Sequence, residues 1–218
     1  MDNQIVRMNP IHNTIFLFLL ISSLFFVKEV HTKRILCFGD SITAYGEWVE
    51  EVGSLDSFST INAGRGGRRA VQARAELAPY LTQYPDLDLL LFFLGVNDLP
   101  ARDPRPGDVK IAECVDSISA AIDLALHYFK PKDIVLIAPC NVNPALMDSI
   151  NLAKGYDITP PLLARMEQQY QLLASKKGTS FLSLFRVVQP ENYKDGLHPN
   201  QAGDREIGDA IKAYLLSR

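Results

Sequence analysis

Short apolar runs alternate with amphipathic segments from Arg34 onward, and this alternation strongly limits the folds available to the chain. The run LDLLLFFL at 87–94 is apolar except for Asp88, which is typical of a strand covered on both faces. Other short apolar runs predict four more strands, and apolar residues spaced three and four apart predict helices. The predicted strands are 35–38, 58–62, 87–94, 134–138 and 181–184, and the predicted helices are 68–80, 109–129, 161–175 and 201–216.

Strands that alternate with helices need crossover connections. The pattern therefore predicts a five-stranded, mostly parallel sheet in a three-layer, flavodoxin-like α/β sandwich. All strands of such a sheet end at one edge, where ligands bind. Two long loops, 99–107 and 141–161, follow the third and fourth strands. The second exceeds the usual length of a connection, which indicates a functional or a mobile segment.

A Gly39-Asp40-Ser41 turn follows the first predicted strand directly. The glycine allows a sharp turn, and the serine then stands at the mouth of the sheet near a helix start. Gly, Asp and Ser are also ordinary turn residues, so this motif alone is not specific.

The segment Asp195-Gly196-Leu197-His198-Pro199 lies just before the last predicted helix. Asp195 and His198 can face the same way, so that the carboxylate holds the imidazole while its other nitrogen accepts a serine proton. Pro199 restricts His198 to an extended backbone. Taken alone, the segment is equally compatible with a solvated turn.

Two further motifs end the second and third strands. In Gly95-Val96-Asn97-Asp98 the Asn97 amide could donate to a developing oxyanion, or Asn97 and Asp98 could only cap a turn. The glycine-rich segment 62–67 leaves N–H groups open to an anion. It lacks the Gly-Lys-Ser/Thr of a phosphate loop, and Arg69 replaces the third glycine of a dinucleotide fingerprint. Oxyanion donation fits it better.

These four motifs, in this order, resemble the blocks of the SGNH hydrolases, also called the GDSL esterase/lipase family. The resemblance covers nearly everything after Arg34, and residues 33–41 with the closing segment are similar to the bacterial arylesterase branch. The G-x-S-x-G elbow of the α/β-hydrolases is absent. The resemblance implies Ser41 as nucleophile, His198 as general base and acid, and Asp195 as the third triad member.

It also implies an oxyanion hole made of the Ser41 N–H, the Gly67 N–H and the Asn97 side chain. Gly67 is chosen because the family glycine lies five residues after the strand-end asparagine, with Gly64 as the alternative. Arg68 and Arg69 follow where the family often has a small or acidic residue. They could favour an anionic substrate, but we expect a solvated helix start.

The net charge and the cysteine and histidine patterns limit the kinds of partner and cofactor that the protein is expected to bind. With 22 basic and 25 acidic residues the net charge is −3, which offers no electrostatic footprint for nucleic acid. The cysteines have no C-x-x-C spacing and lie in apolar stretches, so we expect buried hydrophobes. The histidines form no H-x-x-x-H pair. We predict no metal and no cofactor, and the expected partner is a small-molecule or carbohydrate ester.

The expected reaction is hydrolysis of short-chain, acetyl-type esters of sugars, alcohols or aryl alcohols through an acyl-enzyme on Ser41. The segment after residue 33 contains no inserted apolar lid for a long lipid chain. Acyl transfer to another acceptor by the same triad remains an alternative. A non-catalytic flavodoxin-like binding module is a further alternative. Binding alone, however, does not require the joint presence of Ser41, Asn97, Asp195 and His198.

Residues 1–33 predict a signal peptide or an N-terminal anchor ahead of a catalytic domain at 34–218. The apolar run at 15–27 suits the core of a secretory signal and is short for a span of about 20 residues. No small-x-small cleavage pair follows Val27. The protein is therefore expected to be exported (periplasmic or secreted) or attached to a membrane through 15–27, and cytoplasmic if the start of the chain is over-predicted.

Overall fold

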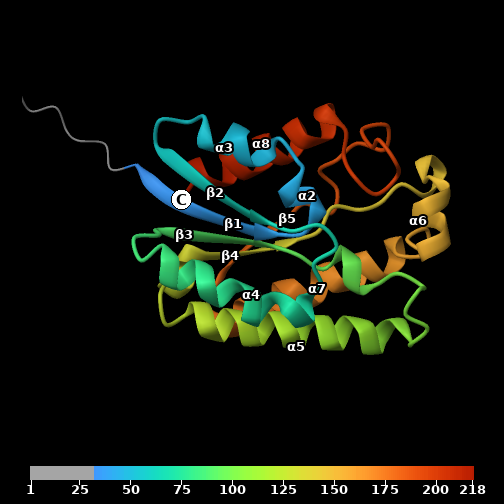
Figure 1. The fold of residues 1–218 in the computed structure, drawn as a ribbon, viewed down its shortest axis with the longest axis horizontal. Helices are drawn as coiled ribbons and strands as arrows, with labels where there is room; N and C mark the ends of the chain where they lie inside the picture. Colours follow the sequence, from blue (N-terminus) through green and yellow to red (C-terminus); the bar gives the residue numbers. More distant parts are fainter. Residues whose placement is uncertain (1–31) are drawn as a thin grey trace, which may run out of the picture. The chain divides into compact units, whose positions relative to one another are not determined.

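The computed structural model describes residues 32–218, which fold around one parallel sheet (Figure 1). Every pair of neighbouring strands is parallel, in the order β2-β1-β3-β4-β5. All strands therefore end at the same edge. The strands are β1 (Lys33–Gly39), β2 (Phe58–Gly64), β3 (Leu89–Phe93), β4 (Ile134–Ala138) and β5 (Ser180–Ser183).

Helices cover both faces of the sheet. In Figure 1, α3 and α8 lie on one face, and α4, α5 and α7 lie on the other. The helices are α2 (Ser41–Ala44), α3 (Trp48–Gly53), α4 (Ala70–Gln83), α5 (Gly107–Ala125), α6 (Ser149–Lys154), α7 (Pro160–Lys177) and α8 (Gln201–Leu216). The predicted three-layer α/β sandwich with five strands is confirmed.

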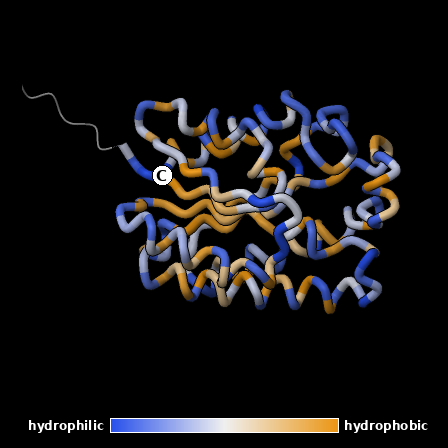
Figure 2. Tube along the Cα trace, viewed as in Figure 1, coloured by the Kyte–Doolittle hydropathy of each residue, from blue (hydrophilic) through white to orange (hydrophobic). Residues whose placement is uncertain are grey.

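The core lies along the sheet, where Figure 2 shows hydrophobic strands between amphipathic helices. All five residues of β3 and all five of β4 are buried, as the continuous apolar runs predict. Trp48 is fully buried, and its indole N–H donates to the Ile42 carbonyl at 3.0 Å. This bond fixes the turn that leaves β1. The three cysteines are buried and free, as expected, and burial raises the pKa of their thiols.

Three short helices differ from the prediction. Helices α2 and α3 have four and six residues, too few for a helical period to show in the sequence. Helix α6 lies within the long segment 141–161, which is therefore partly helical and not a simple loop. Asp148 caps the start of α6, since its carboxylate accepts from the Asn151 N–H at 2.7 Å.

The predicted signal or anchor lies outside the described residues, apart from its last two positions. Strand β1 begins at Lys33, one residue before the expected start of the catalytic domain. Within residues 32–218, no helix is both long enough and apolar enough to span a bilayer.

Candidate active site

Ser41 is the first residue of α2 and follows β1 after a single residue, Asp40. The Asp40 carboxylate caps the helix by accepting from the Ile42 N–H at 3.0 Å. A side chain at Gly39 would place its Cβ 2.0 Å from Thr43 Oγ1 and 2.5 Å from the Phe93 carbonyl oxygen. Only glycine fits there. The Gly-Asp-Ser turn thus brings the serine to the end of the sheet.

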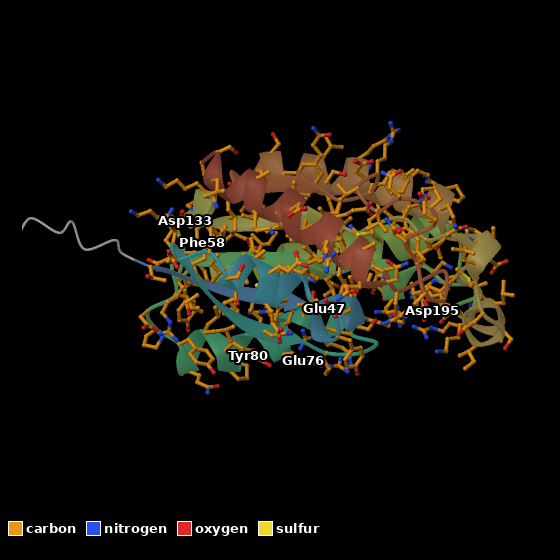
Figure 3. The ribbon with its side chains drawn as sticks, turned by 90° about the horizontal axis from the view of Figure 1, so that it is seen from above. Glu47, Phe58, Glu76, Tyr80, Asp133 and Asp195 are labelled. Carbon is orange, nitrogen blue, oxygen red and sulfur yellow. The ribbon has the colours of Figure 1, made fainter. Side chains whose placement is uncertain are left out.

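His198 links Ser41 to Asp195. Its Nε2 lies 2.9 Å from Ser41 Oγ, and its Nδ1 lies 2.7 Å from Asp195 Oδ2. Figure 3 shows Asp195 at the opposite end of the domain from Phe58 and Asp133, which lie where β2 and β4 begin. The predicted triad residues therefore meet at the edge where the strands end.

The turn that carries Asp195 is rigidly held. Its Oδ1 accepts from the backbone N–H groups of Leu197, at 3.0 Å, and His198, at 2.7 Å. Gly196 has a φ of 77°, and a Cβ there would lie 2.6 Å from the backbone of Met147. The Lys194 N–H donates to the His198 carbonyl at 2.9 Å. These bonds fix the direction of the imidazole.

The same bonds keep Asp195 ionised. Burial acts to raise the pKa of this carboxyl, but hydrogen bonds from the His198 backbone and ring, with the charge of His198, outweigh it. The pKa of Asp195 therefore lies below its ordinary value. A carboxylate that stays charged can hold Nδ1 protonated, which leaves Nε2 to accept a proton from the serine hydroxyl.

The structure favours Gly67 over Gly64 as the second oxyanion donor. Gly67 has a φ of 70°, its N–H has no acceptor in residues 32–218, and no atom lies within 4 Å of an added Cβ. The Gly64 N–H already donates to Asn62 Oδ1 at 2.9 Å, and a Cβ there would lie 2.2 Å from the Ala44 nitrogen. Gly64 is thus a packing glycine.

Asn97 lies in a short 3₁₀ turn (Val96–Asp98) after β3 and is 4% exposed. Its Nδ2 donates to the Arg68 carbonyl at 3.2 Å, and its Oδ1 accepts from the Tyr156 hydroxyl at 2.5 Å. An amide nitrogen carries two hydrogens, and one of them remains for a ligand. Asp98 does cap a helix, since it accepts from the Ala70 N–H that begins α4.

Arg68 contradicts the expectation of a solvated helix start. It is 2% exposed, and its Nη1 donates to the carbonyls of Gly39, at 2.5 Å, and Ala63, at 2.6 Å. Its Nε donates to Glu76 at 2.8 Å, and its guanidinium lies 4.0 Å from the Phe38 ring centroid. Arg68 therefore joins the ends of β1 and β2 under the serine turn. It is not free to bind a substrate anion.

Arg69 is also engaged, although it is partly exposed. Its guanidinium lies 3.5 Å from Asp98, 3.8 Å from Asp103 and 3.7 Å from Glu113. Burial, partly opposed by the Ala70 N–H and by Arg69, raises the pKa of Asp98 to about 6. The Arg69 pairs hold the start of α4 against the loop that follows Asn97.

Sequence reasoning missed Tyr156 and Lys110. Tyr156 is 2% exposed and follows α6. Lys110 is 3% exposed, and its ammonium donates to the carbonyls of Leu99, Pro100 and Asp103 at 2.7, 3.1 and 3.2 Å. Lys110 thereby shapes the loop after Asn97. A lysine within an apolar helical pattern was the one signal in the sequence.

The family model for the GDSL-like lipase/acylhydrolases matches residues 37–206, which include the serine turn, Asn97 and the Asp195–His198 pair. The chain belongs to this family. Membership confirms the predicted enzyme class, a carboxylic ester hydrolase of the GDSL type. Among curated proteins none matches the sequence.

Solved structures share the fold of this GDSL-family chain. The native aryl esterase of M. smegmatis superimposes with a TM-score of 0.71 at 22% identity, over 85% of this chain and 99% of that one. A carbohydrate acetylesterase family member from Sinorhizobium meliloti gives 0.69 at 20% identity, over 85% and 98%. The lipase/acylhydrolase from Enterococcus faecalis gives 0.64 at 21% identity, over 85% and 96%. At these identities the likeness concerns the fold.

Residues 32–218 contain no cluster of three or more His, Cys, Asp or Glu side chains placed to hold a metal ion.

Proposed function

We propose that this protein is a serine esterase that hydrolyses short-chain, acetyl-type esters of sugars, alcohols or aryl alcohols. The observation that carries the proposal is the position of His198, within hydrogen-bond distance of both Ser41 Oγ and Asp195 Oδ2. A hydroxyl, an imidazole and a carboxylate in this order can activate the hydroxyl for attack on an ester carbonyl. Family membership supports ester chemistry at this site.

In the first half-reaction, Ser41 Oγ attacks the ester carbonyl carbon while its proton passes to His198 Nε2. The carbonyl oxygen becomes an oxyanion, for which the Ser41 N–H, the Gly67 N–H and Asn97 Nδ2 are the proposed donors. The tetrahedral intermediate then breaks its bond to the alcohol oxygen. That oxygen takes the proton from Nε2 and leaves as the free alcohol, and the acyl group stays on Ser41.

In the second half-reaction, a water molecule gives a proton to Nε2 and attacks the acyl carbon. The same donors hold the second oxyanion. Its collapse releases the carboxylic acid and returns the proton to Ser41 Oγ. An alcohol that replaces this water would make the enzyme an acyltransferase, which is the second candidate function.

The hollow beside Ser41 is too small to enclose a long acyl chain. It is lined by Ser41, Tyr45, Lys194 and Pro199 among others and measures about 10 Å³, room for about one water molecule. The loop from 99 to 107 is polar and proline-rich, unlike an apolar lid. A flavodoxin-like binding module without chemistry is disfavoured, because binding alone does not require the aligned Ser41, His198 and Asp195.

Product analysis of the full chain tests the proposal. With 4-nitrophenyl acetate we expect acetic acid and 4-nitrophenol, and a Ser41→Ala variant should release neither above background. A parallel reaction with an added alcohol separates the two functions, since a transferase would form the new acetyl ester at the expense of the acid. Failure of the wild-type chain to cleave any short-chain aryl or sugar ester would refute the proposal.

A further inference from the structure

A second cleft lies beside Asn97, among the residues that follow β3. It measures about 370 Å³ and is much larger than the hollow at Ser41. Asn97, one of the proposed oxyanion donors, belongs to its wall. The residues that line it are Arg69, Asn97, Asp98, Pro100, Arg102, Asp103 and Pro104.

Most charges in this wall already have partners. Asp98 accepts from the Ala70 N–H and faces Arg69. Asp103 accepts from the Arg105 guanidinium, at 3.0 Å from Nε and 2.7 Å from Nη2. These pairs leave both carboxylates and Arg69 compensated within the protein.

Arg102 is the cationic residue of the wall that remains uncompensated. It is exposed, and no carboxylate of residues 32–218 lies within ion-pair distance of it. Its Nη2 donates to the Asn97 carbonyl at 3.3 Å, and its side chain also hydrogen-bonds the Tyr156 hydroxyl. Its guanidinium lies 5.6 Å from the Tyr156 ring centroid. The positive charge is thus held against the backbone of Asn97, whose side chain is the proposed oxyanion donor.

The backbone around Arg102 is fixed before any substrate arrives. The Ala101 and Arg102 N–H groups donate to the carbonyls of Gly155, at 3.0 Å, and Lys154, at 3.1 Å. These bonds join the loop after β3 to the end of α6, and both lie at the same end of the domain in Figure 1. Lys110 also holds the Leu99 and Pro100 carbonyls, so the backbone of this loop needs little further ordering when a substrate binds.

We propose that Arg102 binds a carboxylate of the ester substrate in this cleft, so that the enzyme prefers esters that carry a negative charge near the scissile bond. A guanidinium offers paired donors that match a carboxylate, and the polar, proline-bounded wall suits a charged group. The inference rests on the proposed esterase function, because it names the substrate class of that same site.

Two pairs of shape-matched esters test the inference on the full chain. The first pair, 4-nitrophenyl hydrogen succinate and 4-nitrophenyl 4-methylvalerate, carries or lacks a carboxylate on the acyl side. The second pair, 4-acetoxybenzoate and 4-isopropylphenyl acetate, does so on the alcohol side. For each pair, kcat/KM of the charged ester is divided by kcat/KM of the neutral ester, and this ratio is compared between variants. Because every variant acts on the same two esters, the difference in their intrinsic reactivity cancels.

In at least one pair, Arg102→Met should lower this ratio about tenfold, as expected for loss of a charge-assisted hydrogen bond, and salt should weaken the wild-type preference. Arg74→Met is the matched control, since Arg74 is exposed on α4 and lies outside the cleft; its ratios should equal those of the wild type. Unchanged ratios in Arg102→Met, with all four esters cleaved, would overturn the inference alone. If the wild type cleaves none of them, the esterase function itself fails.

Discussion

The hydroxyl of Tyr156 lies 2.5 Å from Oδ1 of Asn97, and this hydrogen bond fixes the direction of the Asn97 amide. A hydroxyl that donates to Oδ1 leaves Nδ2 to face the Arg68 carbonyl and the oxyanion hole. Both side chains are buried, so water does not replace the bond. Tyr156 is therefore a positioning residue for the proposed oxyanion donor.

Removal of this hydroxyl should affect the transition state and not substrate binding. We expect Asn97→Ala to lower kcat by about 10²–10³ with little change in KM. Tyr156→Phe keeps the ring and should lower kcat by about tenfold, also at constant KM. In the Asn97→Ala background it should have no further effect, because the amide that it orients is gone. Equal loss in both backgrounds, measured by steady-state kinetics, would assign Tyr156 a purely structural role.

The pH dependence of kcat/KM should separate Asp195 from the oxyanion donors. Because the pKa of Asp195 is lowered, its carboxylate stays charged in mildly acidic solution, where it can still hold Nδ1 of His198. Asp195→Asn should lower kcat by about 10³–10⁴. The pH profile of kcat/KM should also change in this variant, because the charged carboxylate beside the ring is gone. Asn97→Ala should keep the wild-type profile.

Near wild-type activity in Asp195→Asn would show that something else orients His198. The proposed triad would then reduce to a Ser41–His198 dyad.

Arg68 should be important for stability as well as for the site. Arg68→Met removes the hydrogen bonds to the Gly39 and Ala63 carbonyls and the bond to Glu76. The two buried carbonyls and the Glu76 carboxylate then have fewer partners. We expect the free energy of unfolding to fall by about 3 kcal/mol in urea titrations. The exposed Arg74→Met should change it by less than about 0.5 kcal/mol. Equal stability of the two variants would contradict the structural role of Arg68.

Asp40 should make the fold less stable as pH rises. Burial raises the pKa of Asp40 to about 7. The charge of Asp98 acts in the same direction, and the hydrogen bond from the Ile42 N–H partly opposes it. The folded state therefore binds this proton more tightly than the unfolded chain, in which the pKa is about 3.9. The resulting stability is present below about pH 4 and is lost as pH rises through about 7.

Asp40→Asn keeps an oxygen that can cap α2 but cannot ionise. Relative to wild type, its free energy of unfolding should increase by about 3 kcal/mol between pH 5 and pH 8. Asp116→Asn, on the exposed face of α5, should show no such increase. A pH-independent difference between Asp40→Asn and wild type would indicate that Asp40 is ionised throughout this range.

The sequence alone predicts those features that depend on neighbours along the chain. Continuous apolar runs locate β3 and β4, and Asp195 and His198 are three residues apart within one turn. The serine turn likewise follows its strand directly. Each of these features is visible within about ten residues.

Features that depend on distant contacts could not be predicted in this way. Arg68 is buried because its side chain reaches the Gly39 carbonyl, 29 residues away. From the local sequence Gly-Gly-Arg-Arg alone, an arginine exposed to solvent would be expected. Tyr156 meets Asn97 across 59 residues. Lys110 is satisfied by the carbonyls of a loop whose path the sequence does not specify. For these polar residues burial follows from tertiary structure, not from local pattern.

The most direct test of the central claim is the position of the acyl group during turnover. Wild-type protein mixed with 4-nitrophenyl acetate and quenched in acid should carry one acetyl group, located by peptide mass spectrometry on Ser41, and should show a burst of 4-nitrophenol. Ser41→Ala should show neither. An acetyl group on another residue, together with full activity in Ser41→Ala, would contradict the account.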